Sequence, residues 1–425
     1  MVGSTGLSVA RAANAIGGDT IRVGLVGCGG RGTGAAIQAL NTTGGGVKLT
    51  AVADVFEDNL NGALDAIGNE HADKVEVDDR KFVGCEAFVD VMDSDCDLVI
   101  LATPPGFRPL HFEAAVKAGK HVFMEKPVAS DAPGVRRVLE ANKIAKEKNL
   151  GVQVGLQRRH EFRYNETIDR LRDGAIGDVM LTRVYWNGAG VWIRPRKPDQ
   201  TELEYQMRNW YYFNYLSGDH IVEQHIHNLD VSNWLMDAYP VEAQGVGGRQ
   251  VRTSDQTGQI YDHHMVEFTY DNGVKMLSQC RHQRNCWNSV EEFAHGTEGT
   301  CDLSAAKIMD ASGKVTWQSD AKETNGKGWQ QEHYDFFAAL RAGERPNEVE
   351  YGAKSTMTAI LGRMATYSGN VVKWDDALGS GKPLADFDSL TSFDAEAPVQ
   401  PLDDGSYPVP QPGKYDPLEP KSKRG

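Results

Sequence analysis

Short apolar runs alternate with amphipathic stretches along the first 155 residues. IRVGLVGCG, VKLTAVADV, CDLVILATP, HVFMEKP and LGVQVGLQ are rich in apolar, often β-branched residues, and segments of helical length separate them. Uninterrupted apolar runs of this length are typical of strands buried on both faces of a parallel sheet. The alternation of strand and helix predicts a doubly wound α/β domain of the Rossmann type over residues 21–155.

The pattern changes after residue 156. VMLTRVYWN, VEAQGVGGRQV, DHHMVEFTY, GVKMLSQCR and SVEEFAHG are longer, more nearly alternating runs, and Asp271-Asn272-Gly273 favours a hairpin turn between two of them. Residues 156–390 are therefore expected to form an α+β domain with a large, open, mainly antiparallel sheet and helices on one face. Residues 391–425 are rich in proline and polar residues, which predicts an extended tail over the surface.

Composition is that of a globular protein and argues against two kinds of partner. Hydrophobic residues make up 40% of the 425, and no apolar run approaches the roughly 20 residues that cross a bilayer. A formal net charge of -14 without a long basic run argues against nucleic acid. Six cysteines lie scattered without a CxxC pair, which fits neither a zinc ribbon nor a dense disulfide framework.

Residues 1–20 form a separate segment rich in small side chains. Ala10-Arg11-Ala12 is a triplet of the A-x-A type found at export-signal cleavage sites, but no basic region precedes it. The segment is therefore either the remnant of an export signal or a flexible leader. The export interpretation favours a periplasmic over a cytoplasmic location.

A glycine-rich turn, GCGGRG, follows the first predicted strand. In the pattern G-x-G-x-x-G, Gly27 permits the tight turn, Gly29 lets the backbone approach a pyrophosphate, and Gly32 allows close helix packing. Asp54, at the end of the second strand, is placed to accept hydrogen bonds from an adenosine ribose and would repel a 2′-phosphate. We therefore predict NAD rather than NADP as the cofactor. The predicted loop residues are Gly27, Gly29, Gly30, Arg31 and Gly32.

A second motif follows at the ends of the next two strands. Thr103-Pro104 comes after the third strand, His111 lies on the following helix, and Glu125-Lys126-Pro127 ends the fourth. With the glycine loop, this combination resembles the Gfo/Idh/MocA family of oxidoreductases, through the Rossmann half and, more loosely, up to about residue 380. The resemblance implies that the motif lines the cofactor site, which adds Thr103, Pro104, His111, Glu125 and Lys126 to its predicted residues.

Lys126 also has an interpretation that is independent of the family. A lysine at the carboxyl end of a parallel strand lies at the crevice where such sheets bind ligands. There it can hydrogen-bond a substrate hydroxyl and, if partly desolvated, help in proton transfer. The alternative is a solvated surface charge, and the flanking Glu125 and Pro127 favour the functional interpretation.

The stretch GDHIVEQHIHNLD, residues 218–230, carries three further polar candidates. The family has an Asp here, followed four residues later by a His that begins an H-x-x-D pattern; His227 begins that pattern, but Glu223 stands in place of Asp. On a helix, Glu223 and His227 share a face and His225 points away from it. Oxidation of an alcohol needs a base, so we predict Lys126, His227 and Glu223 as catalytic residues. A helix disfavours a three-ligand metal site, and no metal is predicted.

Two clusters predict a pocket of polyol size. QMRNWYYFNY precedes the catalytic stretch and offers aromatic rings for stacking on sugars, although much of it could equally be core. GLQRRHEFRYN, from Gly155, matches the position where the family's chain leaves the Rossmann domain near the nicotinamide. The predicted substrate-binding residues are Gln157, Arg158, Arg159, Trp192, Arg208, Asn209, Trp210 and His225.

These features predict an NAD-dependent oxidoreductase that transfers hydride at a secondary alcohol of a sugar, glycoside or polyol. Three alternatives stay open: a redox-neutral NAD-dependent glycosidase that works by oxidation and elimination, a non-catalytic cofactor-binding regulator, and a metal-dependent hydrolase using Glu223, His225 and His227. The resemblance also implies a homo-oligomer, a dimer or tetramer formed through the open sheet.

Overall fold

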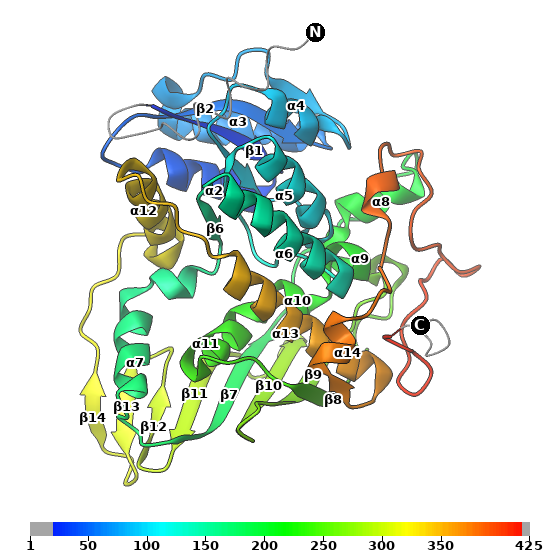
Figure 1. Cartoon of the computed structure of the whole chain (residues 1–425). Helices are drawn as coiled ribbons and strands as arrows, with labels where there is room; N and C mark the ends of the chain where they lie inside the picture. Colours follow the sequence, from blue (N-terminus) through cyan, green and yellow to red (C-terminus); the bar gives the residue numbers. More distant parts are fainter. Residues whose placement is uncertain (1–19, 419–425) are drawn as a thin grey trace.

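The computed structural model describes residues 20–418. Of the predicted leader, residues 1–20, only Thr20 is described; the Ala10-Arg11-Ala12 triplet lies outside the described residues. The described chain forms two sheets, one above the other in Figure 1, with helices between them. No helix among these residues combines the length and apolar character that a membrane span requires.

The first sheet has six parallel strands, and the order of its strands reverses beside β1. Its central strands are almost fully buried because helices cover both faces. The predicted doubly wound domain is thus confirmed, and the crevice at the carboxyl ends of β1 and β4 is where such a sheet binds ligands. In spatial order the strands are β3 (Lys81–Val83), β2 (Val47–Asp54), β1 (Ile21–Val26), β4 (Leu98–Leu101), β5 (His121–Met124) and β6 (Val152–Val154), and the helices between them are α2 (Gly30–Leu40), α3 (Glu57–His71), α4 (Ala87–Asp93), α5 (Arg108–Lys117) and α6 (Ala132–Glu147).

The second sheet has nine strands and is mainly antiparallel, as predicted; its β7 and β10 run parallel. The predicted hairpin connects β9 to β10, where the Tyr270 N–H donates to the Val274 carbonyl at 2.9 Å and Gly273 has a φ of 85°. In spatial order the strands are β14 (Val315–Gln318), β13 (Lys307–Asp310), β12 (Gly299–Asp302), β11 (Ser289–Gly296), β7 (Val179–Gly188), β10 (Lys275–His282), β9 (His263–Thr269), β8 (Glu242–Gly248) and β15 (Val372–Lys373).

Helices cover one face of this second sheet. α11 (Ile226–Met236) packs on β7 and β11, and α13 (Val349–Ser368) packs between α6 of the first domain and β8 and β9 (Figure 1). Along β10, the side chains alternate between buried and half-buried positions, as expected for a sheet covered on one face. The buried face therefore points toward the Rossmann domain.

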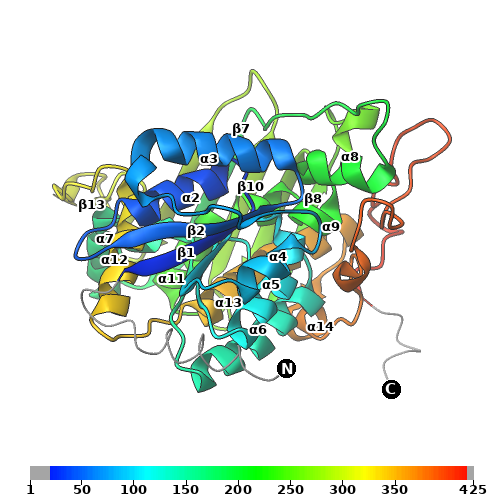
Figure 2. The same ribbon diagram turned by 90° about the horizontal axis from the view of Figure 1, so that it is seen from above.

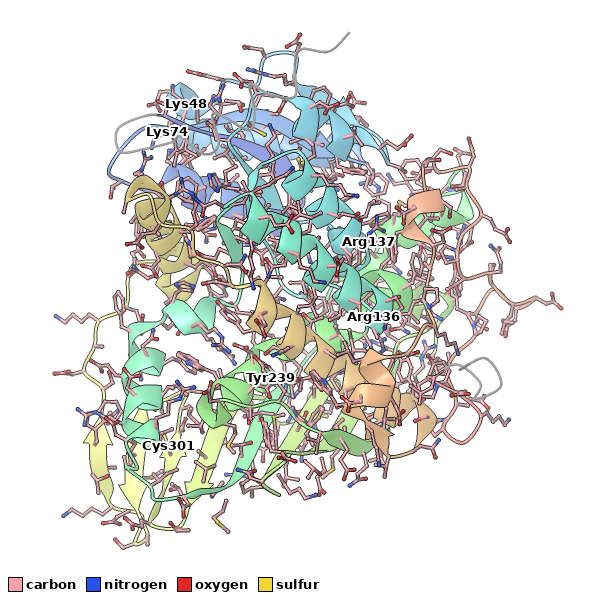
Figure 3. The ribbon with its side chains drawn as sticks, in the orientation of Figure 1. Lys48, Lys74, Arg136, Arg137, Tyr239 and Cys301 are labelled. Carbon is pink, nitrogen blue, oxygen red and sulfur yellow. The ribbon has the colours of Figure 1, made fainter. Side chains whose placement is uncertain are left out.

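Two later segments of the chain return to the Rossmann domain. α12 (Lys327–Arg341) follows the second sheet in sequence but packs on α2, and its Phe336 and Leu340 join the core under β1 and β2. On α6, Arg137 pairs with Asp388 at 2.6 Å and Arg136 donates to the Ser380 carbonyl at 2.7 Å (both arginines are labelled in Figure 3). The two domains are thus packed together along a long seam.

The described part of the tail, 391–418, contains no helix or strand. It runs past α8 (Glu202–Arg208), where the Tyr407 hydroxyl donates to Glu202 at 2.6 Å and the Thr201 hydroxyl donates to the Phe393 carbonyl at 2.7 Å. Tyr407 and Ala397 are buried in an aromatic cluster there. This extended segment therefore covers apolar side chains of the second domain.

Candidate active site

The glycine loop between β1 and α2 leaves room for a pyrophosphate. Gly27 has a φ of +96°, and a Cβ atom on Gly32 would lie 1.8 Å from the Gly27 carbonyl oxygen, so both positions require glycine. A Cβ atom on Gly29 or Gly30 would meet nothing within 4 Å. Gly29 caps α2 without a side-chain hydrogen bond, so the N–H groups of the first turn are open to an anion. The loop therefore fits a dinucleotide.

Asp54 holds this loop from the end of β2. Its carboxylate accepts hydrogen bonds from the Cys28 N–H at 2.6 Å and the Phe56 N–H at 2.8 Å. Burial raises the pKa of Asp54, and these two hydrogen bonds act in the opposite direction. The residue predicted to bind the ribose thus also fixes the turn that receives the pyrophosphate.

The other predicted cofactor residues lie at the ends of β4 and β5 or face them. Arg31 pairs with Glu125 at 2.8 Å, which joins the glycine loop to the end of β5. The Thr103 hydroxyl and His111 Nδ1 are hydrogen-bonded at 3.0 Å, and burial lowers the pKa of His111 to about 3. Pro104 follows Thr103 directly, before the short 3-10 turn Pro105–Phe107. The structure therefore gathers these side chains along one edge of the sheet, as the motif predicts.

Lys126 connects the two domains. It follows β5, and its Nζ donates to the Glu223 carbonyl oxygen at 2.6 Å, with the Glu223 carboxylate 3.4 Å away. Glu223 ends α10 (His220–Glu223), which belongs to the second domain. The two side chains are only 13% and 15% exposed. The lysine is therefore a mostly buried ammonium group at the crevice, and the interpretation as a solvated surface charge is wrong.

The prediction of one continuous helix through Glu223 and His227 is wrong. α10 ends at Glu223 and α11 begins at Ile226, with a turn between them. The two residues of the turn are held by β10 side chains: Gln224 Oε1 is hydrogen-bonded to His282 Nε2, and His225 Nε2 to Ser278 Oγ, each at 2.8 Å. Because of this turn, Glu223 and His227 do not form an i, i+4 pair within one helix.

His227 nevertheless lies within range of the positive charge of Lys126. It is 7% exposed, and its ring stacks on Trp186 at 6.0 Å between centroids. Burial, and next the positive charge of Lys126, hold the pKa of His227 well below its usual range. His227 is therefore neutral at physiological pH and carries a lone pair that can accept a proton.

Four of the predicted substrate-binding residues already have protein partners. Arg158 pairs with buried Glu292, and Arg159 forms two 2.9 Å hydrogen bonds with buried Asp230. Arg208 and Asn209 are also engaged.

The Arg208 guanidinium lies 3.6 Å from the Phe56 ring centroid and pairs with Asp58 of α3. The Asn209 side chain accepts from the Arg194 N–H and donates to the Gln256 carbonyl. The structure does not bring the Arg208 guanidinium to Lys126, because Asp58 holds it on the Rossmann domain.

Three of the remaining predicted substrate-binding residues have either a polar atom without a hydrogen-bond partner or an exposed aromatic ring. Gln157 begins the 3-10 turn Gln157–His160 after β6, and its Oε1 is buried without a hydrogen-bond partner. His225 uses one ring nitrogen for Ser278, and its Nδ1 has no partner. Trp192 is 39% exposed and packs edge-on against Trp210 at 6.0 Å.

A buried cluster of Asp219, His220 and His264 has ligand atoms within 4.8 Å of one another. Asp219 accepts from the Tyr367 hydroxyl at 2.6 Å and the Tyr261 N–H at 2.8 Å, and its other oxygen is 2.8 Å from His220 Nδ1. Buried Arg252 lies against His220. Its positive charge would repel a metal ion bound at this cluster. We interpret the cluster as a hydrogen-bonded network. Glu223, His225 and His227 do not gather either, since Lys126 and Ser278 hold the first two.

Two residues near the site were not predicted from the sequence. Arg108 is 1% exposed, and its guanidinium donates to the carbonyl oxygens of Thr103 and Pro127, on either side of the crevice. Burial lowers the pKa of Arg108 to about 10, against the opposite effect of Glu125 and Glu223. Tyr211 is 2% exposed, with a hydroxyl that has no partner. Arg108 adjoins the Thr-Pro motif and Tyr211 lies in the aromatic run, but neither has a spacing signal of its own.

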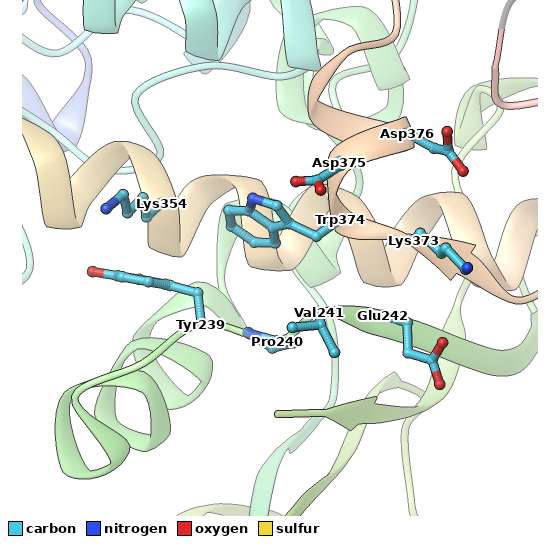
Figure 4. Close-up of a pocket in the computed structure, with 9 residues that line it drawn as sticks. All are labelled: Tyr239, Pro240, Val241, Glu242, Lys354, Lys373, Trp374, Asp375 and Asp376. Atoms are coloured by element: carbon cyan, nitrogen blue, oxygen red, sulfur yellow. The ribbon is translucent and has the colours of Figure 1, made fainter. Parts of the chain in front are cut away.

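A separate pocket of about 560 Å³ lies at the β8 and β15 edge of the second sheet, beside α13 and α14 (Trp374–Leu378) (Figure 4). Tyr239 and Trp374 face each other in it at 6.0 Å, and Lys354 lies 5.2 Å from the Tyr239 ring. None of the predicted catalytic, cofactor or substrate residues lines it. It is therefore distinct from the crevice around Lys126.

The fold and this crevice define a two-domain oxidoreductase with an NAD-binding Rossmann domain. Residues 21–156 match the model of the oxidoreductase family with an NAD-binding Rossmann fold, and residues 164–302 match the C-terminal domain model of the same family. The chain belongs to the Gfo/Idh/MocA family, and NAD is its cofactor.

The chain is similar to proteins named as inositol dehydrogenases. The chain is 30% identical over 220 residues to an inositol 2-dehydrogenase/D-chiro-inositol 3-dehydrogenase of Shouchella clausii, an alignment covering 51% of this chain and 54% of that protein. An inositol 2-dehydrogenase of Acidiphilium cryptum is 26% identical over 76% of this chain and 87% of its own. The crystal structure of scyllo-inositol dehydrogenase from Lactobacillus casei with bound NAD(H) and scyllo-inositol has a TM-score of 0.63, 21% identity, and covers 84% of this chain and 99% of that chain.

Replacing Arg159 with Ala is expected to destabilise the fold. Asp230 would remain buried and charged without its partner, so the free energy of unfolding should fall by about 3–5 kcal/mol in urea denaturation. Lys354→Ala removes an exposed ion pair with Glu350 and should change it by less than about 1 kcal/mol. An equally small effect of Arg159→Ala would show that the Arg159–Asp230 pair does not support the fold.

Stability is expected to fall as the pH drops below 6.5. Burial lowers the pKa of His225 to about 3 and that of His220 to about 4, from an ordinary value of 6.5. Between these values the unfolded chain binds a proton at each position that the folded chain does not. Each histidine should therefore remove about 1.4 kcal/mol of unfolding free energy per pH unit.

This pH dependence can be assigned to one residue. Urea denaturation between pH 7 and pH 5 should show a shallower slope for His225→Gln than for the parent protein, by about one proton. An unchanged slope would mean that His225 is protonated in the folded state.

Proposed function

We propose that the protein is an NAD-dependent dehydrogenase that oxidises a secondary alcohol of a sugar, glycoside or polyol. The observation that carries the proposal is the pairing of a buried Lys126 ammonium with a neutral His227 at the crevice of an NAD-binding sheet. The relatives described above, named as inositol dehydrogenases, support this class of substrate.

The two side chains divide the work on the hydroxyl group. Lys126 donates hydrogen bonds, so it stabilises negative charge that develops on the carbinol oxygen. Neutral His227 accepts the hydroxyl proton and becomes imidazolium as the carbinol carbon becomes a carbonyl. NAD, when bound, supplies the acceptor for the hydride that leaves this carbon.

Glu223 is a positioning residue in this scheme. Its backbone carbonyl, rather than its carboxylate, makes the short hydrogen bond to Lys126, at 2.6 Å against 3.4 Å. Because that contact is made by the backbone, having Glu in place of the family's Asp at this position leaves the main contact with Lys126 intact. The carboxylate adds a compensating negative charge beside the ammonium.

The alternatives have less support. The metal-dependent hydrolase needs Glu223, His225 and His227 around one ion, and Lys126 and Ser278 hold the first two apart. A regulator without catalysis does not need a neutral base beside a buried lysine. The redox-neutral glycosidase uses the same first oxidation step and differs in whether NADH accumulates.

We also propose a homo-oligomer formed through the open face of the second sheet. No helix of the described chain covers this face (Figure 1), and its strands present Val246, Met265, Leu277 and Phe293 in neighbouring rows. Val246 is 68% and Met265 48% exposed, and Trp287, which packs on Tyr185 of β7, is 61% exposed. Gln279, Glu267 and Arg183 stand in register among these apolar side chains, and a mixed, uncovered face with exposed apolar residues is typical of a protein interface.

Lys126→Ala is expected to lower kcat by a factor of about 10²–10⁴ on a substrate that the parent protein oxidises, tested with myo-inositol, scyllo-inositol and D-glucose. Titration of NADH fluorescence should show that cofactor binding is weakened far less than kcat, because the glycine loop and Asp54 are unchanged and only the Lys126 contact is lost. Lys354→Ala, far from the crevice, serves as the matched control. Full activity of Lys126→Ala would refute the proposed function.

Met265→Asp is expected to dissociate the oligomer, because it replaces an exposed apolar side chain of this face with a charge. Light scattering after size exclusion should give a multiple of 46.6 kDa for the parent protein and a smaller mass for the variant. Leu402→Asp, at an exposed position in the tail, is the control and should leave the mass unchanged. A monomeric parent protein would contradict the proposal.

A further inference from the structure

Tyr211 carries an unused hydrogen-bonding group close to the crevice. It lies in the 3-10 turn Trp210–Tyr212, is 2% exposed, and has a hydroxyl with no partner in the protein. Burial, and next the carboxylate of Glu223, hold the pKa of Tyr211 well above its usual range, so the hydroxyl keeps its proton. A buried donor of this kind is normally satisfied, by protein, by water or by a ligand.

The position of Tyr211 is set by the same network that shapes the catalytic turn. Its ring stacks on His282 at 6.0 Å, and His282 is hydrogen-bonded to Gln224, the residue after Glu223. Tyr211 therefore lies one side chain away from the segment that contacts Lys126.

An aromatic surface continues from Tyr211 to the outside of the molecule. Trp192 packs edge-on against Tyr211 at 6.3 Å and against Trp210 at 6.0 Å, and it is 39% exposed. Arg194 lies 5.1 Å from the Trp192 ring. The Trp192 ring is therefore packed against Tyr211, Trp210 and Arg194, while part of it stays exposed to solvent.

The segment that carries Trp192 has no regular structure, yet it is held in place. Residues 189–201 connect β7 to α8 along the outside of the molecule (Figure 2). The Arg194 N–H donates to Asn209 at 2.9 Å, and the Tyr212 hydroxyl donates to the Val191 carbonyl at 3.3 Å. Asn209 and Tyr212 flank Trp210 and Tyr211, so the loop and the turn form one unit.

We propose that Trp192, Trp210 and Tyr211 form a subsite for a second ring of the substrate, beside the position where the first ring is oxidised. The substrate is then a glycoside whose aglycone, a second sugar or an aryl group, stacks on Trp192, while the Tyr211 hydroxyl donates to an oxygen near the glycosidic link. Aromatic side chains with a few placed polar groups are the usual lining of a carbohydrate pocket.

This inference rests on the proposed function and narrows it. A monocyclic polyol that fits between Lys126 and His227 would leave the Trp192 surface bare. A substrate with two rings would cover it. The proposal therefore predicts a preference for two-ring over one-ring substrates that depends on Trp192.

The test compares matched substrates on the parent protein and on Trp192→Ala. The pairs are methyl and 4-nitrophenyl glucosides of the same anomer, and glucose with maltose or cellobiose. The parent protein should have a kcat/KM about tenfold higher for the two-ring member of at least one pair. Trp192→Ala should raise KM about tenfold for that member only, with little change in kcat.

Two variants control this experiment. Trp329→Ala removes another exposed tryptophan, on α12 at the other side of the molecule (Figure 1), and should leave both KM values unchanged. Trp192→Phe keeps an aromatic ring and should restore most of the two-ring preference if Trp192→Ala loses it by loss of stacking. Tyr211→Phe should raise the two-ring KM without altering the thermal unfolding temperature.

Several outcomes would overturn the subsite. These are no two-ring preference in the parent protein, equal effects of Trp192→Ala on both members of a pair, or a smaller oligomer mass in that variant with an unchanged KM ratio. The last result would show that Trp192 is a subunit contact. If Lys126→Ala abolishes oxidation but Trp192→Ala shows no split, the proposed function stands and only the subsite fails.

Discussion

The hydrogen bond from Lys126 to the Glu223 carbonyl is the contact on which the site depends, because it joins the two domains at the reactive position. Two other buried cations also bind loop carbonyls here, Arg108 within the Rossmann domain and Arg363 between the two domains. Arg108 binds the carbonyls of Thr103 and Pro127, and Arg363 of α13 binds those of Ser130 at 2.7 Å and Gly218 at 3.0 Å. Charged groups thus fix loop carbonyls that no regular strand or helix would hold.

Burial and neighbouring charges at this seam determine the protonation of His227. Lys126 is paired with Glu223, whereas burial and the positive charges of Lys126 and Arg158 keep His227 neutral. Burial also lowers the pKa of His220, His225 and His282, and these three histidines serve as hydrogen-bonding groups. A donor and an acceptor of protons can therefore coexist within one small crevice, which is the requirement for oxidising an alcohol.

Much of the fold could be predicted because it depends on local patterns. The buried strands follow from apolar runs, and these strands also place the lysine after β5. The turn at Gly27 follows from a backbone conformation that favours glycine. The break between α10 and α11 could not be predicted, since it comes from His282 and Ser278, more than 50 residues away in sequence. Arg208 likewise has a partner, Asp58, that only the packing of the two domains brings near.

Residues of the substrate pocket were the hardest to predict for the same reason. Arg158 and Arg159 lie near the end of β6 as expected, yet buried carboxylates from β11 and α11 use their charges. Tyr211 was hidden in an aromatic run where core and pocket residues have the same pattern. Only the contact of its ring with His282, which is hydrogen-bonded to Gln224 beside Glu223, places Tyr211 near the crevice.

The most direct test of the central claim is the yield of NADH for each sugar oxidised. A glycoside or polyol and NAD would be incubated with the 425-residue protein, and NADH absorbance, keto product and free sugar would be followed in parallel. Equimolar NADH and keto product without release of free sugar is the result expected of a dehydrogenase. Release of free sugar from a glycoside while no NADH accumulates would contradict it, since the hydride would then return to the substrate.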